Sequence, residues 1–450
     1  MTQATAPATA SPATRPAVRA IEFFSGIGGL HYGFTYARVP GTVVAAFDVN
    51  AVANQCYAHN FPSTPVSTAS IEHLTTQDLV KLNADAWFLS PPCQPFTRGG
   101  KGLDHADARS RGLLHLTSLV TTSRHPPRYV FLENVKNFET SECRRILVNA
   151  LAARGFEIAE CLLEPTALGV PNSRLRYYLL ARRRKDGDGE VEKEGQTVGA
   201  YSDRGVVQTA WPVRFEVTRE ESGEEVAGAV GEEVETAGDK QAATADDTRS
   251  ATVDTDAKDA VEAPMDAGVD VDDPLRSATT TPAVPVDPIA KYLDAQPDPA
   301  CAVPEPWIRQ SKKFIFDIVS DRGARSATFT KGYGSKHVFG SGPFLASVPE
   351  SQLTKDVLGN VESVLALKPR FFSPTEVARL HCFPAEMTFP LGVTKAQQYR
   401  LLGNSLNVKV VGELMKVLFA EEGEVQPDSG AEEVESTVDV TESKVDKKER

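Results

Sequence analysis

The sequence predicts an α/β fold with a mostly parallel sheet that helices cover on both faces. Two observations lead to this prediction. Short apolar runs alternate with stretches of helical periodicity between residues 21 and 182, which is the pattern of successive βαβ units. Glycines or polar residues directly follow several of these runs, and ligands of such sheets bind at the carboxyl ends of the strands.

Each element of the predicted sheet follows from its local pattern. Apolar runs predict strands at 21–24, 43–47, 86–89, 129–132, near 157–163 and at 176–182. Helical periodicity predicts helices at 30–36, 51–59, 71–82, 113–121 and 141–153. The stretch 96–111 is Gly-rich and charged, so we expect a mobile loop there.

Charge divides the chain into folded and unfolded parts. The whole chain has 450 residues and a net charge of −13. Residues 186–300 carry 28 acids and 9 bases, and 421–450 carry 11 acids and 4 bases, whereas the remainder carries 22 acids and 35 bases. Acidic segments poor in aromatics cannot bury enough apolar surface to fold. We therefore expect a disordered insert at 186–286, a disordered tail at 421–450, and a basic body that suits a polyanionic partner.

The rest of the chain gives the expected domain boundaries. A leader at 1–19 that is rich in Ala, Thr and Pro, and that we expect to be disordered, precedes a catalytic domain at 20–185. Order is expected to resume near 287, with a small irregular recognition unit at 287–370. The catalytic domain is completed by 371–420, where Ser373-Pro374-Thr375-Glu376 is typical of a capped helix start. A second such helix is expected after the loop Gly403-Asn404-Ser405.

Cysteine spacing and hydropathy limit the cellular compartment and the class of protein that we expect. The six cysteines form no CxxC pair, which argues against a zinc site and against a disulfide framework. No apolar stretch approaches the roughly 20 residues of a membrane helix. We expect no metal, no membrane partner, a reducing compartment such as cytoplasm or nucleus, and a monomer.

The tetrapeptide Pro91-Pro92-Cys93-Gln94 is the most informative motif. It follows the predicted strand 86–89, and its two prolines restrict the backbone in front of the thiol. A cysteine held rigidly at a strand end is a candidate nucleophile. The alternative is a buried structural cysteine, which is the commoner fate of a free thiol.

Two further features suit a ligand at the first two strand ends. The turn Phe24-Ser25-Gly26-Ile27-Gly28-Gly29 lets a ligand approach the backbone near a helix start, although it lacks the spacing of a dinucleotide site or P-loop. Asp48 ends the next strand and could hold two ribose hydroxyls. The alternatives are an ordinary tight turn and an ordinary helix cap.

Charged residues at later strand ends suit a planar base. Glu133 could bind the edge of an amidine-like base, or it could cap the next helix. Arg174 and Arg176 lie two residues apart and enter a strand, so they could orient a carboxylate or grip a phosphate. The alternative for this pair is one exposed and one salt-bridged arginine.

Together these motifs resemble those of the cytosine-5 methyltransferase family. The resemblance covers 21–182 and roughly 310–418. Six motifs carry it in the family's order: the glycine turn at 24–29, Asp48, Pro91 to Gln94, Glu133-Asn134-Val135, Asn172 to Arg176 and Gly403-Asn404-Ser405. The resemblance implies a Rossmann-like methyltransferase fold with S-adenosylmethionine as cofactor. It implies that this cofactor is bound by Phe24, Ser25, Gly26, Gly28, Gly29, Asp48, Val49, Ile71, Asn404 and Ser405.

The resemblance also implies a mechanism. The Cys93 thiolate adds to carbon 6 of a cytosine, and carbon 5 then takes the methyl group. Glu133 binds the ring nitrogen and exocyclic amine, Arg176 contacts the base carbonyl, and Arg174 supports the cysteine loop. The target base must lie outside a stacked helix.

Within the family, the chain looks most like the branch that methylates the anticodon loop of aspartate tRNA. Pro95 to Arg98, Leu168 to Arg174, Phe329 to Gly334 and Arg400 to Asn407 carry this likeness. One departure is Thr328, where the branch has a cysteine. We therefore expect a tRNA substrate, with a DNA cytosine-5 methyltransferase and an inactive nucleic-acid binding protein as alternatives.

Overall fold

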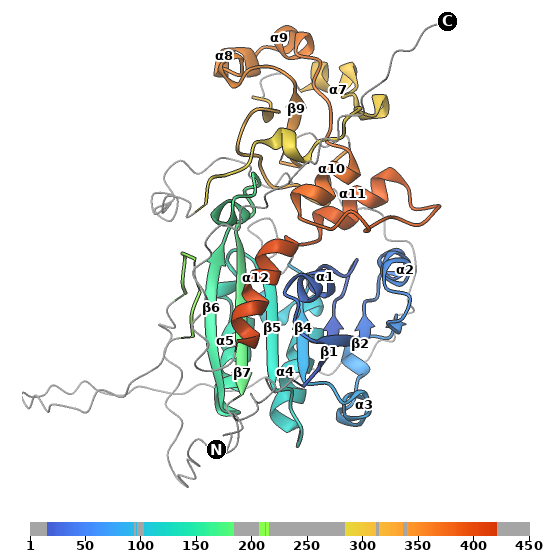
Figure 1. The fold of residues 1–450 in the computed structure, drawn as a ribbon, viewed down its shortest axis with the longest axis vertical. Helices are drawn as coiled ribbons and strands as arrows, with labels where there is room; N and C mark the ends of the chain where they lie inside the picture. Colours follow the sequence, from blue (N-terminus) through green and yellow to red (C-terminus); the bar gives the residue numbers. More distant parts are fainter. Residues whose placement is uncertain are drawn as a thin grey trace, which may run out of the picture.

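A seven-stranded sheet forms the centre of the molecule (Figure 1). The computed structural model describes residues 16–93, 96, 103–183, 207–211, 213–215, 284–311, 315–335 and 340–420. The strands are β1 (Val18–Phe23), β2 (Gly41–Phe47), β3 (Val66–Ser67), β4 (Ala86–Leu89), β5 (Tyr129–Val135), β6 (Phe156–Leu163) and β7 (Arg176–Arg183). Their order is β3-β2-β1-β4-β5-β7-β6, and only β7 runs against its neighbours. The prediction of an α/β fold with a mostly parallel sheet is confirmed.

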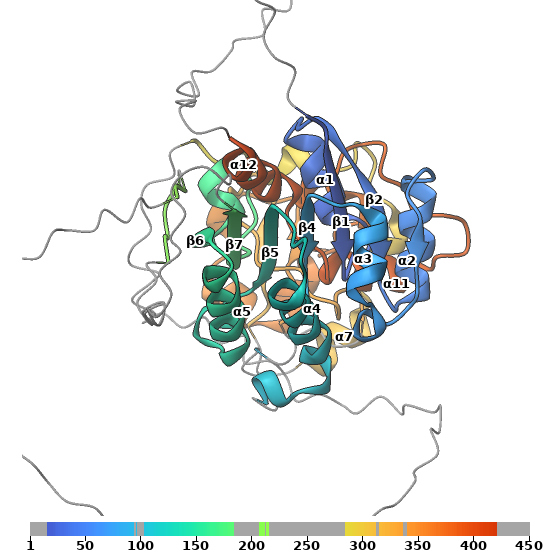
Figure 2. The ribbon, with the colours of Figure 1, turned by 90° about the horizontal axis from the view of Figure 1, so that it is seen from below.

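Helices cover both faces of the sheet, as Figure 2 shows from below. On one face lie α1 (Gly29–Tyr36) and the C-terminal helix α12 (Val408–Phe419), while α4 (Arg111–Thr122) and α5 (Glu142–Ala153) lie on the other. The side chains of each face join a separate hydrophobic cluster. Because α12 packs against α1, the end of the chain returns to complete the first layer.

Two segments near the sheet differ from the sequence prediction. A single helix over 71–82 is wrong: a 3-10 turn at Ile71–His73 is followed by α3 (Thr76–Leu82). The break falls at Thr75, whose side chain caps α3 in a capping box with Asp78 and so starts a new helix. The described part of the expected mobile loop, 103–111, instead contains two 3-10 turns, at Asp104–Ala106 and Ala108–Ser110.

Part of the expected disordered insert is docked on the sheet. The docked segment 207–215, of which 207–211 and 213–215 are described, forms a bridge with β6, in which Leu162 N donates to Gln208 O at 2.8 Å and Gln208 N donates to Glu160 O at 2.9 Å. Val213 is buried at 2% exposure. The expectation of disorder is therefore wrong for 207–211 and 213–215, because backbone bonds to β6 and the packing of Trp211, Val213 and Phe215 dock these residues on the sheet. The rest of the insert up to 283, residues 1–15 of the leader and the tail 421–450 lie outside the described residues.

A smaller unit lies beyond the carboxyl ends of the strands (Figure 1). It begins at 284 and is as irregular as predicted. It contains α7 (Glu305–Gln310), a pair of short strands β8 (Ile318–Ser320) and β9 (Phe344–Ala346), α8 (Lys355–Leu358) and α9 (Val361–Ala366). The helices α10 (Pro374–Leu380) and α11 (Lys395–Gly403) lie between this unit and the sheet.

Local sequence explains the start of these last helices. Ser373 and Glu376 form the capping box that was predicted for α10, and Asn407 caps α12 through its side chain. Helix α11 was not predicted, although Thr394 and Gln397 form a capping box at its start. Within the described residues, no helix is long and apolar enough to cross a membrane. The loop 404–407, which joins α11 to α12, faces the carboxyl edge of the sheet.

Candidate active site

A pocket of about 570 Å³ lies at the carboxyl edge of the sheet. The ends of β1, β2, β4 and β5 form its floor, and the loop between α11 and α12 forms its opposite wall. Of the predicted site residues, thirteen line it: Phe24, Ser25, Gly26, Gly29, Asp48, Val49, Ile71, Cys93, Glu133, Arg174, Arg176, Asn404 and Ser405. The structure thus brings together motifs that are spread over more than 380 residues of sequence.

The glycine turn after β1 presents its backbone to the pocket. Phe24 and Gly26 have positive φ angles of 56° and 52°, which turn the chain sharply at the strand end. The Gly26 amide donates to Asp48 Oδ2 at 2.8 Å. Open space surrounds the position that a Cβ of Gly26 would take, so a ligand can approach the backbone there.

Gly28 serves the turn from behind. Its φ is 85°, and a Cβ at this position would lie 2.5 Å from the Phe61 ring. Gly28 is absent from the residues that line the pocket. Its predicted role in cofactor binding is therefore indirect: it lets the turn pack against helix α2 (Ala51–Asn60) and the residue that follows it.

Asp48 and its neighbours form one side of the pocket. The two carboxylate oxygens of Asp48 accept from Gly26 N and from Asn50 N, each at 2.8 Å, and each oxygen retains acceptor capacity. Val49 is 73% exposed and Ile71 is buried. Asp48 can therefore accept hydroxyl donors between two apolar side chains, as a ribose joined to an adenine ring requires.

One buried polar group fits a polar ligand at this end. The Ser25 hydroxyl is 3% exposed and has no hydrogen-bond partner among the described residues. A buried hydroxyl without a partner costs free energy, so a ligand that bonds to it gains affinity. The open space at Gly26 and the unpaired hydroxyl of Ser25 fit the amino-acid end of S-adenosylmethionine.

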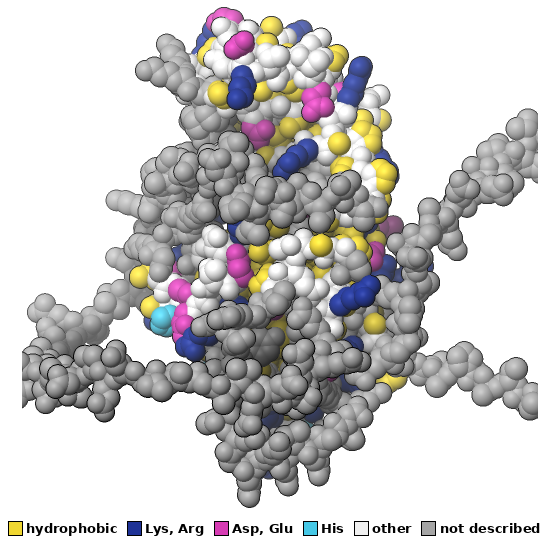
Figure 3. Space-filling model, turned by 90° about the vertical axis from the view of Figure 1, so that its left-hand side faces the viewer, with side chains coloured by type: hydrophobic (Ala, Val, Ile, Leu, Met, Phe, Trp, Pro, Cys, Tyr) yellow, Lys and Arg dark blue, Asp and Glu magenta, His cyan; other side chains and the backbone are white. Residues whose placement is uncertain are grey.

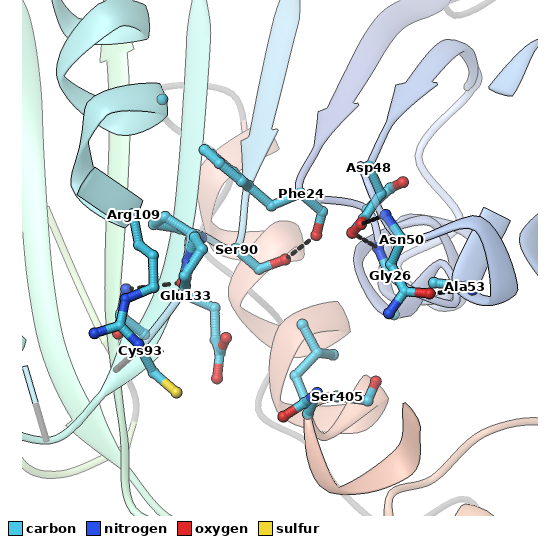
Figure 4. A pocket seen from close by; sticks show the side chains of 18 of the residues that line it. Phe24, Gly26, Asp48, Asn50, Ala53, Ser90, Cys93, Arg109, Glu133 and Ser405 are labelled. Carbon is cyan, nitrogen blue, oxygen red and sulfur yellow. Dashed lines mark hydrogen bonds between the residues drawn. The ribbon is translucent and has the colours of Figure 1, made fainter. Parts of the chain in front are cut away.

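Cys93 lies at the other end of the pocket, on a loop that is tied to two strands. Ser90 Oγ donates to Phe24 O at 2.9 Å, and Asn134 Nδ2 donates to Pro91 O at 3.3 Å. Figure 4 shows that the side chains of Cys93 and Glu133 extend into the same part of the pocket. The thiol is only half-buried, so a substrate can reach it.

Glu133 is the buried carboxyl beside the thiol. It is 9% exposed, and the Nε atom of Arg176 lies 3.7 Å from its Oε1. The strand β5 extends three residues beyond the predicted end at 132 because it pairs with β7, and this pairing fixes Glu133 opposite Tyr178. Burial raises the pKa of Glu133, and the nearby charges of Arg176 and Arg174 only partly offset this effect. Glu133 is therefore suited to donate as well as accept a hydrogen bond.

Arg174 makes contacts that its predicted role did not include. Its guanidinium donates to the carbonyls of Phe329 (3.1 Å), Gly403 (3.2 Å) and Ser405, whereas support of the cysteine loop was expected. It is 3% exposed and joins three segments that are distant in sequence. Arg174 therefore holds the 403–405 wall of the pocket and the smaller unit that begins at 284 against the sheet.

Thr328 takes part in the same junction. Its hydroxyl donates to Ser173 O at 2.6 Å, and two backbone bonds, Ser173 N to Ser326 O (2.8 Å) and Ser326 N to Pro171 O (2.9 Å), run beside it. A threonine at this position thus has a structural use as a donor.

Arg109, Asn50 and Ser90 are among the residues of the site that sequence reasoning missed. Arg109 lines the pocket near Cys93 (Figure 4) and pairs with Asp107 at 2.7 Å. Asn50 caps α2 and also lines the pocket. Ser90 closes β4 against the glycine turn. The sequence Asp107-Ala108-Arg109 after a Gly-rich stretch was a signal for the first of these, and an Asn before a helix was a signal for the second.

Comparisons with known proteins agree with this geometry. The family model described as "C-5 cytosine-specific DNA methylase" matches residues 18–420. The human protein named tRNA (cytosine(38)-C(5))-methyltransferase is 33% identical, covering 89% of this chain and 99% of its own. A Dictyostelium discoideum protein named DNA (cytosine-5)-methyltransferase is 32% identical over 90% and 94% of the two chains. The crystal structure of a Spodoptera frugiperda DNMT2 mutant superposes with a TM-score of 0.63 and 31% identity, covering 90% of this chain and all of its own.

Proposed function

The chain belongs to the C-5 cytosine-specific DNA methylase family, and we propose that it methylates carbon 5 of a cytosine in tRNA. One observation carries the proposal: a half-buried thiol and a buried carboxyl share one pocket with a glycine turn and an aspartate suited to a nucleoside cofactor. The human relative, which this chain matches over nearly its whole length, is named for cytosine 38 of tRNA.

S-adenosylmethionine, the cofactor of the family, would occupy the end of the pocket between the glycine turn and Asp48. Asp48 would accept from the ribose hydroxyls, Val49 and Ile71 would contact the adenine, and Ser25 and Gly26 would face the amino-acid end. Asn404 and Ser405 line the pocket and would contact the cofactor there. The bound cofactor supplies an electrophilic methyl group.

The protein's own residues prepare the cytosine. The Cys93 thiolate forms a bond to carbon 6, and the electron pair of the C5–C6 double bond becomes available at carbon 5 for the methyl group. Glu133 donates a proton or hydrogen bond to the ring nitrogen and accepts from the exocyclic amine, which stabilises the charge that develops on the ring. Arg176, beside Glu133, would donate to the base carbonyl. A base then removes the carbon 5 proton, and the bond to Cys93 breaks.

The pocket requires a base that has left its stack. Cys93 and Glu133 lie at the floor of the pocket, so a base within a duplex cannot reach them. An anticodon loop presents bases that unstack at low cost. We propose cytosine 38 in this loop as the target, and aspartate tRNA as the carrier, as the branch likeness implies.

A DNA substrate is the second candidate function. The Dictyostelium relative with the DNA name is nearly as similar to this chain as the human relative with the tRNA name. Percentage identity therefore does not choose between the two polymers.

Transfer of labelled methyl from S-adenosylmethionine to total tRNA and to genomic DNA would test the proposal. We expect label in tRNA, its loss with Cys93→Ala, and its loss when cytosine 38 of an aspartate tRNA transcript is replaced by uridine. Label in DNA, together with no label in tRNA, would overturn the proposal that tRNA is the substrate. Binding of tRNA and cofactor without any transfer, while an active relative works in parallel, would show a protein that has lost catalysis.

A further inference from the structure

A buried carboxyl that the proposed chemistry does not use lies behind the glycine turn. Glu22, on β1, is fully buried. Its Oε1 accepts from Leu30 N, in the first turn of α1, at 3.1 Å, and its Oε2 accepts from the Tyr57 hydroxyl, on α2, at 2.8 Å. One carboxyl thus connects a strand to both helices that flank the turn.

The network continues to the back of the turn. The Tyr57 hydroxyl lies 2.9 Å from His31 Nδ1, and the His31 ring stacks on Phe61 with centroids 3.8 Å apart. Phe61 is the side chain against which Gly28 packs. The pocket therefore lies in front of the turn, and a continuous wall of hydrogen-bonded and stacked groups lies behind it.

Glu22 also supplies a missing helix cap. Gly28 occupies the cap position of α1 and has no side chain to accept from the first amides of the helix. These amides need an acceptor when they are buried. Glu22 provides one from the neighbouring strand, which fixes the position of the helix start.

We propose that Glu22 is a positioning residue for the cofactor, holding the glycine turn between helices α1 and α2 in the geometry that binds S-adenosylmethionine. The inference rests on the proposed function, because that function gives the turn its ligand. Glu22 acts through the turn and does not line the pocket.

The network is satisfied whether or not Glu22 carries a proton. When Glu22 is ionised it accepts from Tyr57, whose oxygen accepts from His31 Nδ1–H; when it is protonated the two bonds run in the opposite direction. Burial raises the pKa of Glu22 to about 8, opposed by bonds from the Tyr57 hydroxyl and from the backbone amides of His31 and Leu30, and the Asp48 carboxylate raises it further. Burial lowers the pKa of His31 to about 4, so its ring is neutral. A glutamine can make the same bonds as the protonated acid.

Calorimetric titration of S-adenosylhomocysteine into the full chain would test the proposal. We expect Glu22→Gln to keep the affinity within about threefold, and Glu22→Ala to weaken it about tenfold or more, because the Leu30 amide and the Tyr57 hydroxyl each lose a buried hydrogen-bond partner. Glu160→Ala is the matched control: Glu160 is 3% exposed, lies on β6 and accepts from Arg144 and the Tyr177 hydroxyl, far from the turn. This control should lower the melting temperature but leave the affinity unchanged.

The outcomes separate this inference from the proposed function. A wild-type chain that fails to bind S-adenosylhomocysteine would refute the proposed function. If the wild type binds, equal affinity of Glu22→Ala and wild type, or an equal loss in Glu160→Ala, would refute the positioning role. Should Glu22→Ala not fold, Tyr57→Phe removes one hydroxyl alone, and unchanged affinity in that variant would refute the role as well.

Discussion

Cys93 and the glycine turn lie at opposite ends of one pocket, so the thiol and the cofactor should be separable. We predict that Cys93→Ala abolishes methyl transfer while the affinity for S-adenosylhomocysteine stays within about twofold, because the thiol acts on the base. Radiolabel transfer and calorimetry on the same preparation measure both quantities. A matching loss of affinity would show that Cys93 supports the pocket structurally.

Glu133 combines burial with two arginine neighbours, and its raised pKa keeps it protonated to a higher pH than an exposed glutamate. We predict that Glu133→Gln lowers kcat about 100-fold or more, because the amide cannot transfer a proton to the ring nitrogen. The wild-type rate should fall as pH rises through the pKa of Glu133, because the carboxyl then loses the proton that it donates. Glu139→Gln, four residues beyond the end of β5, is the control and should keep kcat.

Glu22 makes folding stability depend on pH. Its pKa is about 8 in the folded state, compared with 4.5 for an ordinary glutamate, so the folded state holds a proton that the unfolded state has lost. Stability from this group is therefore lost as pH rises from about 4.5 to about 8. We predict that the difference in free energy of unfolding between Glu22→Gln and wild type grows, in favour of the variant, by up to about 2 kcal/mol from pH 6 to pH 7.5. Urea unfolding of both chains at these pH values checks it, and parallel curves would contradict it.

At the scale of elements, the docked segment 207–215 determines how the insert can be shortened. It pairs with β6, buries Val213, and places Phe215 against the Arg182 guanidinium at 4.3 Å. Two chains separate its effect from that of the rest of the insert. One, the linker chain, replaces 216–283 by a flexible linker of about 20 residues. The other lacks 184–283 and joins Arg183 to Val284 through a flexible linker of about 30 residues.

We predict that the linker chain keeps the wild-type melting temperature, whereas the chain lacking 184–283 melts lower and aggregates, because the edge of β6 is left uncovered. Val213→Asp in the full chain should reproduce the lower melting temperature, since burial of one valine contributes about 1.5–3 kcal/mol. Differential scanning calorimetry and light scattering measure these effects. Equal melting of all four chains would show that the segment does not stabilise the fold.

A comparison of the elements shows which parts of the fold can be predicted from the sequence. Strand β4 has the predicted bounds and helix α10 begins at the predicted residues, because an apolar run and a capping box are local signals. The insertion of β7 between β5 and β6 is not local, since strand order depends on contacts across the sheet. The docked segment 207–215 was not predicted, because the average composition of the long acidic insert does not reflect the apolar character of these nine residues.

The same distinction holds for the site. Cys93, Glu133 and Asp48 were found because each follows a predicted strand, and strand ends share one edge of the sheet. Arg109 follows no strand and reaches the pocket only through the 3-10 turn that carries it. The bonds of Arg174 to Gly403 and Ser405 could not be read from sequence because they join residues about 230 positions apart.

At the scale of the whole molecule, the chain combines a basic body with two acidic segments, the insert and the tail. Residues 1–185 and 301–420 carry 35 bases and 22 acids. On the described face that Figure 3 shows, basic and acidic side chains are interspersed among apolar and neutral ones. Selection of one RNA therefore requires more than a uniform basic surface, and competing polyanions must be kept from the body.

The acidic residues of the insert can compete with unrelated polyanions for the basic body. Residues 216–283 hold 19 acids and 5 bases, so a neutral linker in their place takes the chain from −13 to +1. We predict that the linker chain binds unrelated duplex DNA and RNA about tenfold more tightly at 50 mM salt, with a steeper fall of affinity as salt rises, because more phosphate contacts form. Fluorescence anisotropy across a salt series measures both. A chain with residues 216–283 scrambled keeps the charge and should behave as wild type, because the effect depends on charge and not on order. If the scrambled chain instead matches the linker chain, a specific sequence within 216–283 would be responsible, and electrostatic competition would be the wrong explanation.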